Sequence, residues 1–323
     1  MLEKPDVVEW TETAQQPDGL TKAERLEFLE RLYREAPTRE RARDARLELA
    51  RELLRQDQPG AAREHFEALW AEEQDDPVAS RARYELARLA VEVDQDLDSG
   101  RRLLRETIVD TPPWAGADLA LDYLLRLEKP RQSPSALAAE LGEMAGEMQD
   151  DRLASRLYLE KGRLLSPIAG RANDALQAFR AGYARCPDCA ATDDSLMEMA
   201  DIYARFQQWE PATQALEIVA ARTERSFFVG TYSSHRASDA RMRLGIIAMD
   251  HLQDLDAARA HFQRFLRDFD GHLHSDRAAW RLVQIEGLTG SPRSHRRALE
   301  NFIERYPHSR RVPSAQALLR ELS

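Results

Sequence analysis

A short pattern of small and bulky residues returns along most of this 323-residue chain, and it restricts the fold more than any other feature. A small residue is followed four positions later by a bulky apolar one, and three positions after that by a small or apolar one. Positions i, i+4 and i+7 share one stripe of an α-helix, so each copy predicts a buried helical face. Clear copies are Ala62-Phe66-Leu69, Ala175-Phe179-Gly182, Ala212-Leu216-Val219 and Ala258-Phe262-Phe265, with weaker ones starting at Gly100, Ala138 and Ala298. Successive copies begin 37 to 46 residues apart.

A second small residue stands about 12 residues before each clear copy, as in Leu49-Ala50, Leu86-Ala87, Met199-Ala200 and Leu244-Gly245. We interpret it as the point of closest contact on a first helix, with the Ala-x3-Phe pattern on a second helix. Turn signals such as QDQPG at 56–60 and SPIAG at 166–170 separate the two helices. The sequence therefore predicts helix pairs at about 40–73, 78–110, 115–148, 151–185, 191–222, 235–268 and 275–305.

The chain resembles tetratricopeptide repeat (TPR) proteins over roughly residues 38–323. The best copy is Leu196, Met199, Ala200, Tyr203, Ala212, Leu216 and Val219, which follows the family's spacing of small and bulky residues. Two features depart from the family: the period is near 38, against about 34, and Trp is absent from the first-helix signature. The resemblance implies an all-α fold, a right-handed α-solenoid of about seven helix pairs with N- and C-terminal capping helices. HEAT-like helix pairs are the alternative.

The domain organisation follows from the repeat. We expect an extended or disordered lead at 1–20, an N-terminal capping helix at 21–37, one TPR-like block at 38–150 and a second at 151–323 that ends in a capping helix at about 312–322. Thr21 and Glu24 form a capping-box signature for the first helix. KPRQSP at 129–134 is a candidate point of flexing, and the loop at 223–236 carries Phe227, Phe228, Val229 and Tyr232 either to pack on the solenoid or to contact a partner.

Composition excludes several classes of protein. The net charge of −10 and pI near 5.4 argue against general nucleic-acid binding. No apolar run approaches the length that a membrane span needs, so membrane insertion is not expected. Two Cys rule out a disulfide scaffold. We expect a cytoplasmic protein, or one of the cell envelope if a leader was removed, because the last 50 residues resemble bacterial TPR proteins of the envelope.

Signatures of catalysis and of metal binding are weak. The sequence contains no GxxxxGK[ST], GxGxxG, HExxH or GxSxG, so no catalytic residue, cofactor or enzymatic activity is predicted. Cys186-Pro187-Asp188-Cys189 falls at the end of an expected helix and is interpreted as a turn, with a disulfide open under oxidising conditions. His272 and His274, with His261 or an Asp, are a metal candidate, but they fit an ordinary turn better and no metal site is predicted.

The TPR resemblance also implies where a partner binds, because the family uses a concave groove lined by the first helices. Its groove positions fall on eleven candidate partner-binding residues: Arg51, Arg55, Arg81, Tyr84, Arg88, Arg156, Arg163, Met197, Arg205, Met242 and Met249. We predict that Arg51, Arg88 and Arg163 hold an acidic portion of the partner, and that the Met side chains take apolar anchors. The alternative is that these Arg pair with neighbours such as Glu48 and Glu85.

These inferences favour a non-catalytic scaffold or adaptor that binds a protein or peptide partner, within a multiprotein complex. A peptide-responsive regulator and an accessory subunit of an enzyme complex are the alternatives. The chain has 42 Arg and only four Lys, which suits either ion-pair networks or the recognition of anions. The oligomeric state is not predicted.

Overall fold

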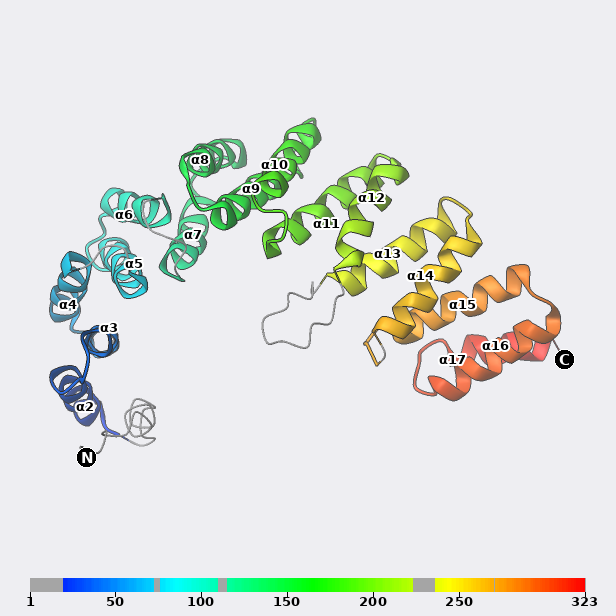
Figure 1. Ribbon diagram of the computed structural model, residues 1–323, viewed down its shortest axis with the longest axis horizontal. Coiled ribbons are helices and arrows are strands. Elements are labelled where there is room, and N and C mark those ends of the chain that lie inside the picture. Colours follow the sequence, from blue (N-terminus) through cyan, green and yellow to red (C-terminus); the bar gives the residue numbers. More distant parts are fainter. Residues whose placement is uncertain (1–19, 73–75, 110–114, 223–235, 270, 323) are drawn as a thin grey trace, which may run out of the picture. The chain divides into compact units, whose positions relative to one another are not determined.

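The structure is a computed structural model that describes residues 20–72, 76–109, 115–222, 236–269 and 271–322. Within these ranges every regular element is an α-helix, and the 16 helices are labelled α2 to α17 (Figure 1). Nearly all of the lead expected at 1–20, and the four apolar residues of the 223–236 loop, lie outside the described residues.

The helices follow one another along the chain with short connections. Their bounds are α2 Lys22–Arg34, α3 Arg39–Arg55, α4 Pro59–Glu72, α5 Pro77–Glu92, α6 Leu97–Val109, α7 Ala115–Glu128, α8 Pro134–Glu147, α9 Asp151–Leu165, α10 Ala172–Arg185, α11 Ala190–Arg205, α12 Trp209–Ala221, α13 Ala237–Asp250, α14 Leu255–Asp268, α15 Ser275–Thr289, α16 Pro292–Arg305 and α17 Val312–Glu321. Each of the seven ranges expected to hold a helix pair contains two helices, from α3–α4 to α15–α16. The prediction of an all-α, TPR-like solenoid is confirmed.

The chain divides into two compact units, Met1–Ala154 and Ser155–Ser323, and the division falls within α9. In the first unit each helix from α2 to α6 contacts the next one, and α5 also contacts α7. In the second unit each helix from α10 to α16 contacts the next one in the same way (Figure 1). Each unit is therefore a stack in which helices pack mainly against their near neighbours in the sequence.

The repeated small and bulky residues are the core of these stacks. Ala62 and Phe66 of α4 are fully buried, and so are Ala258 and Phe262 of α14. The first helix has a small residue where the bulky residue packs against it. A Cβ added to Gly245 of α13 would lie 2.6 Å from the Phe262 ring. Each buried Phe contributes about 1.5–3 kcal/mol to stability, so the pattern that repeats in the sequence also supplies much of the packing energy.

Helix starts and intra-pair turns also follow local signals. Thr21 and Glu24 form the expected capping box, in which the Glu24 backbone amide donates to the Thr21 hydroxyl and the Glu24 carboxylate accepts from the Thr21 amide. Ser133 and Ser291 cap α8 and α16 directly before a Pro. Four turns between the helices of a pair contain a residue with φ of 56–59°, at positions 57, 95, 207 and 253. The left-handed residue reverses the chain so that the second helix can pack back on the first.

Candidate functional site

Charged side chains of consecutive first helices form one connected set in each unit. We call the residues Arg51, Glu85, Arg88, Glu92 and Tyr123, from α3, α5 and α7, the first-helix face of unit 1. The first-helix face of unit 2 comprises Arg163, Asp194, Glu198, Asp201, Arg205, Arg243, Asp250, Arg277, Trp280, Arg281 and Arg311, from α9, α11, α13 and α15 and the start of α17. Both faces contain residues that the sequence analysis assigned to partner binding.

On unit 1 the face is a chain of alternating charges. Arg51 Nε lies 3.4 Å from Glu85 Oε1, and Arg88 contacts both Glu85 (Nη1–Oε2, 3.0 Å) and Glu92 (Nη2–Oε2, 2.8 Å). The Tyr123 hydroxyl donates to Glu92 Oε1 over 3.0 Å. Each carboxylate is therefore shared by cationic or hydroxyl donors, and the face has few acceptor positions left open.

The pKa values on this face follow from the same contacts. Burial would raise the pKa of Glu92, but the hydrogen bonds from Arg88 and Tyr123 outweigh it and lower that pKa. Burial together with the hydrogen bond to Glu92 raises the pKa of Tyr123 to about 12. The hydrogen bond to Glu92 also raises the pKa of Arg88. Near neutral pH Glu92 therefore stays negative, Arg88 stays positive and Tyr123 stays a neutral hydrogen-bond donor, which stabilises one arrangement.

The predicted partner-binding residues of unit 1 have different surroundings. Arg51 also contacts Glu48 at 2.7 Å, so the alternative of local pairing describes this residue as well as Arg88. Arg55 is exposed and contacts Glu52 at 2.7 Å. Arg81 is half-buried, and its Nε has no hydrogen-bond partner within the described part of the chain. Tyr84 is only 7% exposed and packs edge-on against Tyr123, with ring centroids 6.2 Å apart.

On unit 2 the face is linked from helix to helix by Arg–carboxylate pairs. Arg163 of α9 contacts Asp194 Oδ2 at 3.0 Å and Glu198 Oε1 at 3.1 Å, both on α11. Arg243 of α13 reaches back to Asp201 of α11 at 2.5 Å. The series continues with Arg281 of α15 on Asp250 of α13 (2.9 Å) and Arg311 on Asp276 of α15 (3.2 Å). These pairs join residues one repeat apart, so they align neighbouring repeats.

Two of the three Met residues predicted as apolar anchors are buried. Met197 and Met242 are 5% and 4% exposed and pack inside the stack. Met249 is partly buried, with its Sδ 3.9 Å from Arg281 Nη1. Arg205 is exposed at the end of α11 and donates to the Ser166 hydroxyl over 2.9 Å. Arg156 is half-buried on α9.

Two hollows open on the first-helix face of unit 2. The larger has a volume of about 770 Å³ and is lined by Arg163, Ser166, Pro167, Glu198, Asp201, Ala204 and Arg205, so it brings two predicted residues, Arg163 and Arg205, together. The second, of about 390 Å³, is lined by Arg277, Trp280, Arg281, Gln284 and Arg311. Arg277 is exposed, and its side chain makes no hydrogen bond or ion pair with the described residues.

Sequence reasoning missed the second hollow for a specific reason. The groove positions were counted from the small residue of each first helix, which stands 12 or 13 residues before the second-helix pattern. Thirteen residues before Ala298 stands Ile285, which is fully buried and not small. The seventh repeat therefore offered no reference position, although the helical period itself would have placed Arg277, Arg281 and Gln284 on one stripe.

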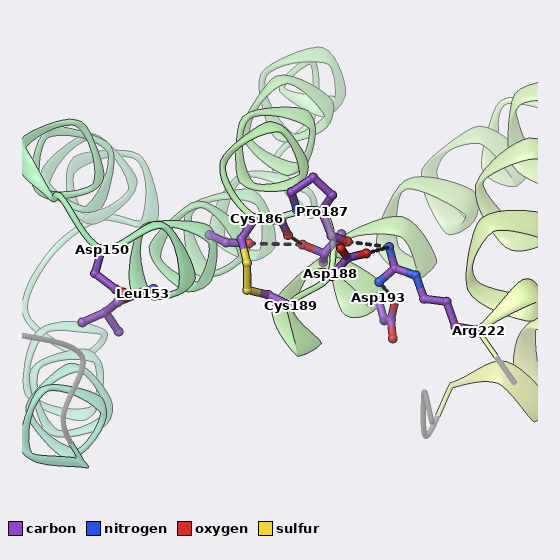
Figure 2. The surroundings of a disulfide bond; sticks show 10 residues. Asp150, Leu153, Cys186, Pro187, Asp188, Cys189, Asp193 and Arg222 are labelled. Carbon is purple, nitrogen blue, oxygen red and sulfur yellow. Dashed lines mark hydrogen bonds and ion pairs between the residues drawn. A yellow bond between two sulfur atoms is a disulfide. The ribbon is translucent and has the colours of Figure 1, made fainter. Parts of the chain in front are cut away.

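The Cys186–Cys189 turn joins α10 to α11 and contains a disulfide (Figure 2). The two Cα atoms lie 5.5 Å apart. The Thr192 hydroxyl donates to the Cys186 carbonyl, and Arg222 at the end of α12 donates to the Pro187 carbonyl. The sequence left the oxidation state of this pair open, and the structure has it oxidised.

The His-rich turn before α15 shows no metal-binding geometry among the described residues, where no group of three or more His, Cys, Asp or Glu side chains could hold an ion. His272 Nδ1 accepts from the His274 backbone amide at 3.2 Å, and its Nε2 lies 3.4 Å from the Ser238 hydroxyl. Both ring nitrogens thus have contacts of an ordinary turn. Asp270 lies outside the described residues.

The comparison with protein families decides between the kinds of helix-pair solenoid. Residues 239–272, which cover most of α13 and all of α14, match the family model of the tetratricopeptide repeat. This segment is a tetratricopeptide repeat. The earlier α9–α10 pair has the same small-to-bulky contact, since a Cβ added to Gly162 would lie 2.3 Å from the Phe179 ring, and the resemblance stated from the sequence is thereby confirmed. TPR repeats typically serve protein–protein interaction and are generally non-catalytic.

Solved structures that are similar to this chain share little sequence with it. One is a signal transduction ATPase with numerous domains and a tetratricopeptide repeat sensor from Pyrococcus horikoshii, at 17% identity, TM-score 0.48, over 92% of this chain and 46% of that one. This chain thus spans less than half of that protein. Others are the human IFIT1 dimer with PPP-AAAA (11%, 0.41, 93% and 78%) and the P58(IPK) TPR domain (12%, 0.29, 97% and 88%). No curated protein in the comparison matches the sequence.

The membrane expectation concerns helix length and polarity. Among the helices that the structure describes, none is both long enough and apolar enough to cross a bilayer.

Proposed function

We propose that this protein is a non-catalytic scaffold or adaptor that holds a segment of a partner protein on the first-helix face of unit 2, as a subunit of a multiprotein complex. The observation that carries the proposal is the pair of hollows on that face, both lined by Arg side chains. TPR stacks present such extended faces to partners because each repeat adds one more helix to the same surface.

The chemistry of the hollows favours an acidic partner segment. Arg205 is exposed and held by a neutral hydroxyl, and Arg277 has no carboxylate partner among the described residues. Both guanidinium groups are therefore available for charge-assisted hydrogen bonds to a carboxylate. Trp280 lines the same hollow as Arg277 and supplies an apolar surface beside the charge.

The Arg residues first proposed for this role contribute less in this arrangement. Arg51, Arg88 and Arg163 each contact two or more carboxylates of the chain itself. Exchanging one carboxylate for another gains little free energy, since the internal pair is lost as the new one forms. We infer that these three side chains keep the repeats in register, while Arg205 and Arg277 make the primary contacts with the partner.

Affinity capture with the full chain, followed by calorimetry with the purified partner, tests the proposal. Arg205→Glu and Arg277→Glu are each expected to lower the affinity for the partner at least about tenfold, since each replaces a charge-assisted hydrogen bond by repulsion. Arg293→Glu, exposed on α16 outside both hollows, is the matched control and is expected to leave the affinity within about twofold. An affinity unchanged in Arg205→Glu and Arg277→Glu would contradict the assignment of this face.

A further inference from the structure

A groove lies between α14 and α16, with α15 as its floor, and it shares no residue with the two first-helix hollows. Its volume is about 350 Å³. The floor and lower walls are apolar and are formed by Leu266, Leu282, Val283, Ala298 and Phe302. We call this the α14–α16 groove. Trp280 and Gln284 of α15 line the first-helix hollow, whereas Leu282 and Glu286 line this groove, so the same helix supplies a different stripe to each.

The core of the seventh repeat is less well covered at this groove than the cores of other repeats. Ala62, Ala175 and Ala258, which begin the second-helix pattern in three clear copies, are fully buried. Ala298 begins the pattern in α16 but stays partly exposed, and so do Leu266 and Leu282 beside it. Apolar surface that stays in contact with water at the bottom of a groove favours the entry of an apolar side chain.

The rim of the groove is basic. Arg259 is neutralised by Glu286 (Nη1–Oε2, 2.9 Å) and also donates to Thr289 over 2.9 Å. Arg297 is exposed and makes no hydrogen bond or ion pair with the described residues. Arg305 is also exposed, with its guanidinium carbon 5.9 Å from the Tyr306 ring. The rim thus carries a net positive charge in a chain whose net charge is −10, which favours an acidic occupant over a second, equally acidic copy.

Two amides face the same groove from opposite walls. Gln263 on α14 and Asn301 on α16 are both exposed and line it together with the Arg side chains. A primary amide both donates and accepts, so such a pair can bond the N–H and C=O groups of a bound backbone. Apolar floor, basic rim and amides together suit a peptide segment better than a small anion, which would use only the Arg side chains.

We propose that the α14–α16 groove docks an acidic segment of a partner protein, which inserts one large apolar side chain between α14 and α16 and places its carboxylates on Arg297 and Arg305. The volume lies at the lower end of the range of ligand sites, roughly 300–1,000 Å³, and admits one or two side chains. This contact uses second helices, so it is independent of the first-helix face and would give the scaffold a second attachment point.

The probe is a short fluorescein-labelled peptide of Glu and Asp residues with one central Phe, titrated with the full chain in fluorescence anisotropy. Saturable binding is expected, and replacing the Phe by Ala is expected to weaken it at least about tenfold because the apolar anchor is lost. Equal affinities of the two peptides, or no saturable binding of the Phe peptide, would overturn the proposal.

Paired variants locate the binding. Arg297→Glu is expected to lower the affinity for the Phe peptide at least about tenfold. Arg293 is exposed on the same helix but outside the groove, and Arg293→Glu is expected to lower that affinity less than about twofold. Asn301→Trp fills the groove and should abolish binding, whereas Glu300→Trp on its neighbour should not. Circular dichroism shows whether each variant keeps its helices. If Arg297→Glu binds like the unaltered chain, the proposal is wrong.

Two further measurements separate the alternatives. Arg277→Glu should weaken the peptide's binding less than Arg297→Glu does, and the reverse order would place the peptide on the first-helix face, which overturns this proposal and not the proposed function. Analytical sedimentation of the full chain should show no self-association through this groove, that is, none that Asn301→Trp removes. Such self-association would mean that a second copy occupies the groove, and it would equally overturn the assignment of an acidic partner segment.

Discussion

Arg222 Nη1 donates to Oδ1 of Asp193 over 2.6 Å, and the Asp193 carboxylate is fully buried. The same guanidinium bonds the Pro187 carbonyl (Figure 2). One side chain at the end of α12 therefore anchors both the Cys186–Cys189 turn and the first turn of α11. Because Asp193 has been removed from water, its charge depends on this partner.

Replacing Arg222 by Leu is expected to lower the free energy of unfolding of unit 2 by about 3 kcal/mol, since it removes a cation that contacts a fully buried carboxylate. Urea unfolding followed by circular dichroism measures the change. The control is Arg264→Leu, which removes an exposed pair with Asp268 at 3.2 Å and should cost less than about 1 kcal/mol. Similar losses in the two variants would contradict the role assigned to Asp193.

The disulfide between Cys186 and Cys189 closes a loop of only four residues. Chain entropy predicts that so short a loop contributes about 2 kcal/mol or less to stability. We expect the urea midpoint to fall slightly on reduction with a phosphine, with no loss of helix. A Cys186→Ser, Cys189→Ser double variant should match the reduced protein and ignore the reductant, and a cooperative loss of unit 2 on reduction would contradict this expectation.

Gly245 faces the fully buried ring of Phe262, and a Cβ there would lie 2.6 Å from its Cε1. Gly245→Ala should therefore destabilise the protein by about 1–3 kcal/mol through overpacking. Gly146 on α8 is exposed and has nothing within 4 Å of its added Cβ. Gly146→Ala should instead stabilise by about 0.5–1 kcal/mol, since only helix propensity changes. Thermal unfolding of both variants gives the comparison, and the same sign for both would refute the packing argument.

His261 on α14 has its pKa held below the ordinary value of 6.5, first by burial and then by Arg241 and Arg264, with Asp254 opposing. The folded state thus binds this proton less readily than the unfolded state. Stability from His261 is present above pH 6.5 and is lost as the pH falls through the lowered pKa. The difference in unfolding free energy between pH 7.5 and 5.5 should shrink in His261→Gln and persist in the control His308→Gln, exposed before α17. His65, whose pKa is also lowered, accounts for part of what remains.

The sequence was sufficient to predict the fold because the fold depends on contacts that recur. Ala62 with Phe66 and Ala258 with Phe262 occupy equivalent places in different repeats, so one pattern determines many helices. Thr21, Ser133 and Ser291 mark helix starts through purely local hydrogen bonds. Neither kind of signal requires knowledge of distant residues.

The candidate surface could be predicted less well because exposure and ion pairing depend on neighbouring repeats. Met197 and Met242 fall on groove positions by spacing, yet the adjacent helices bury them. The sequence predicted that Arg163 binds a partner, but its guanidinium forms ion pairs with Asp194 and Glu198 of the next first helix. Arg277 and Trp280 were missed because the seventh repeat has Ile285 in place of the small residue.

From α2 to α7 in the first unit and from α10 to α17 in the second, helices that are neighbours in the sequence contact one another. Such short-range contacts close small loops, which keeps the entropic barrier to folding low. Once the first few helices have left the ribosome, the segments that they pack against have been synthesised as well. We therefore expect the nascent chain to acquire structure progressively from its N-terminal end, each new pair condensing on the last.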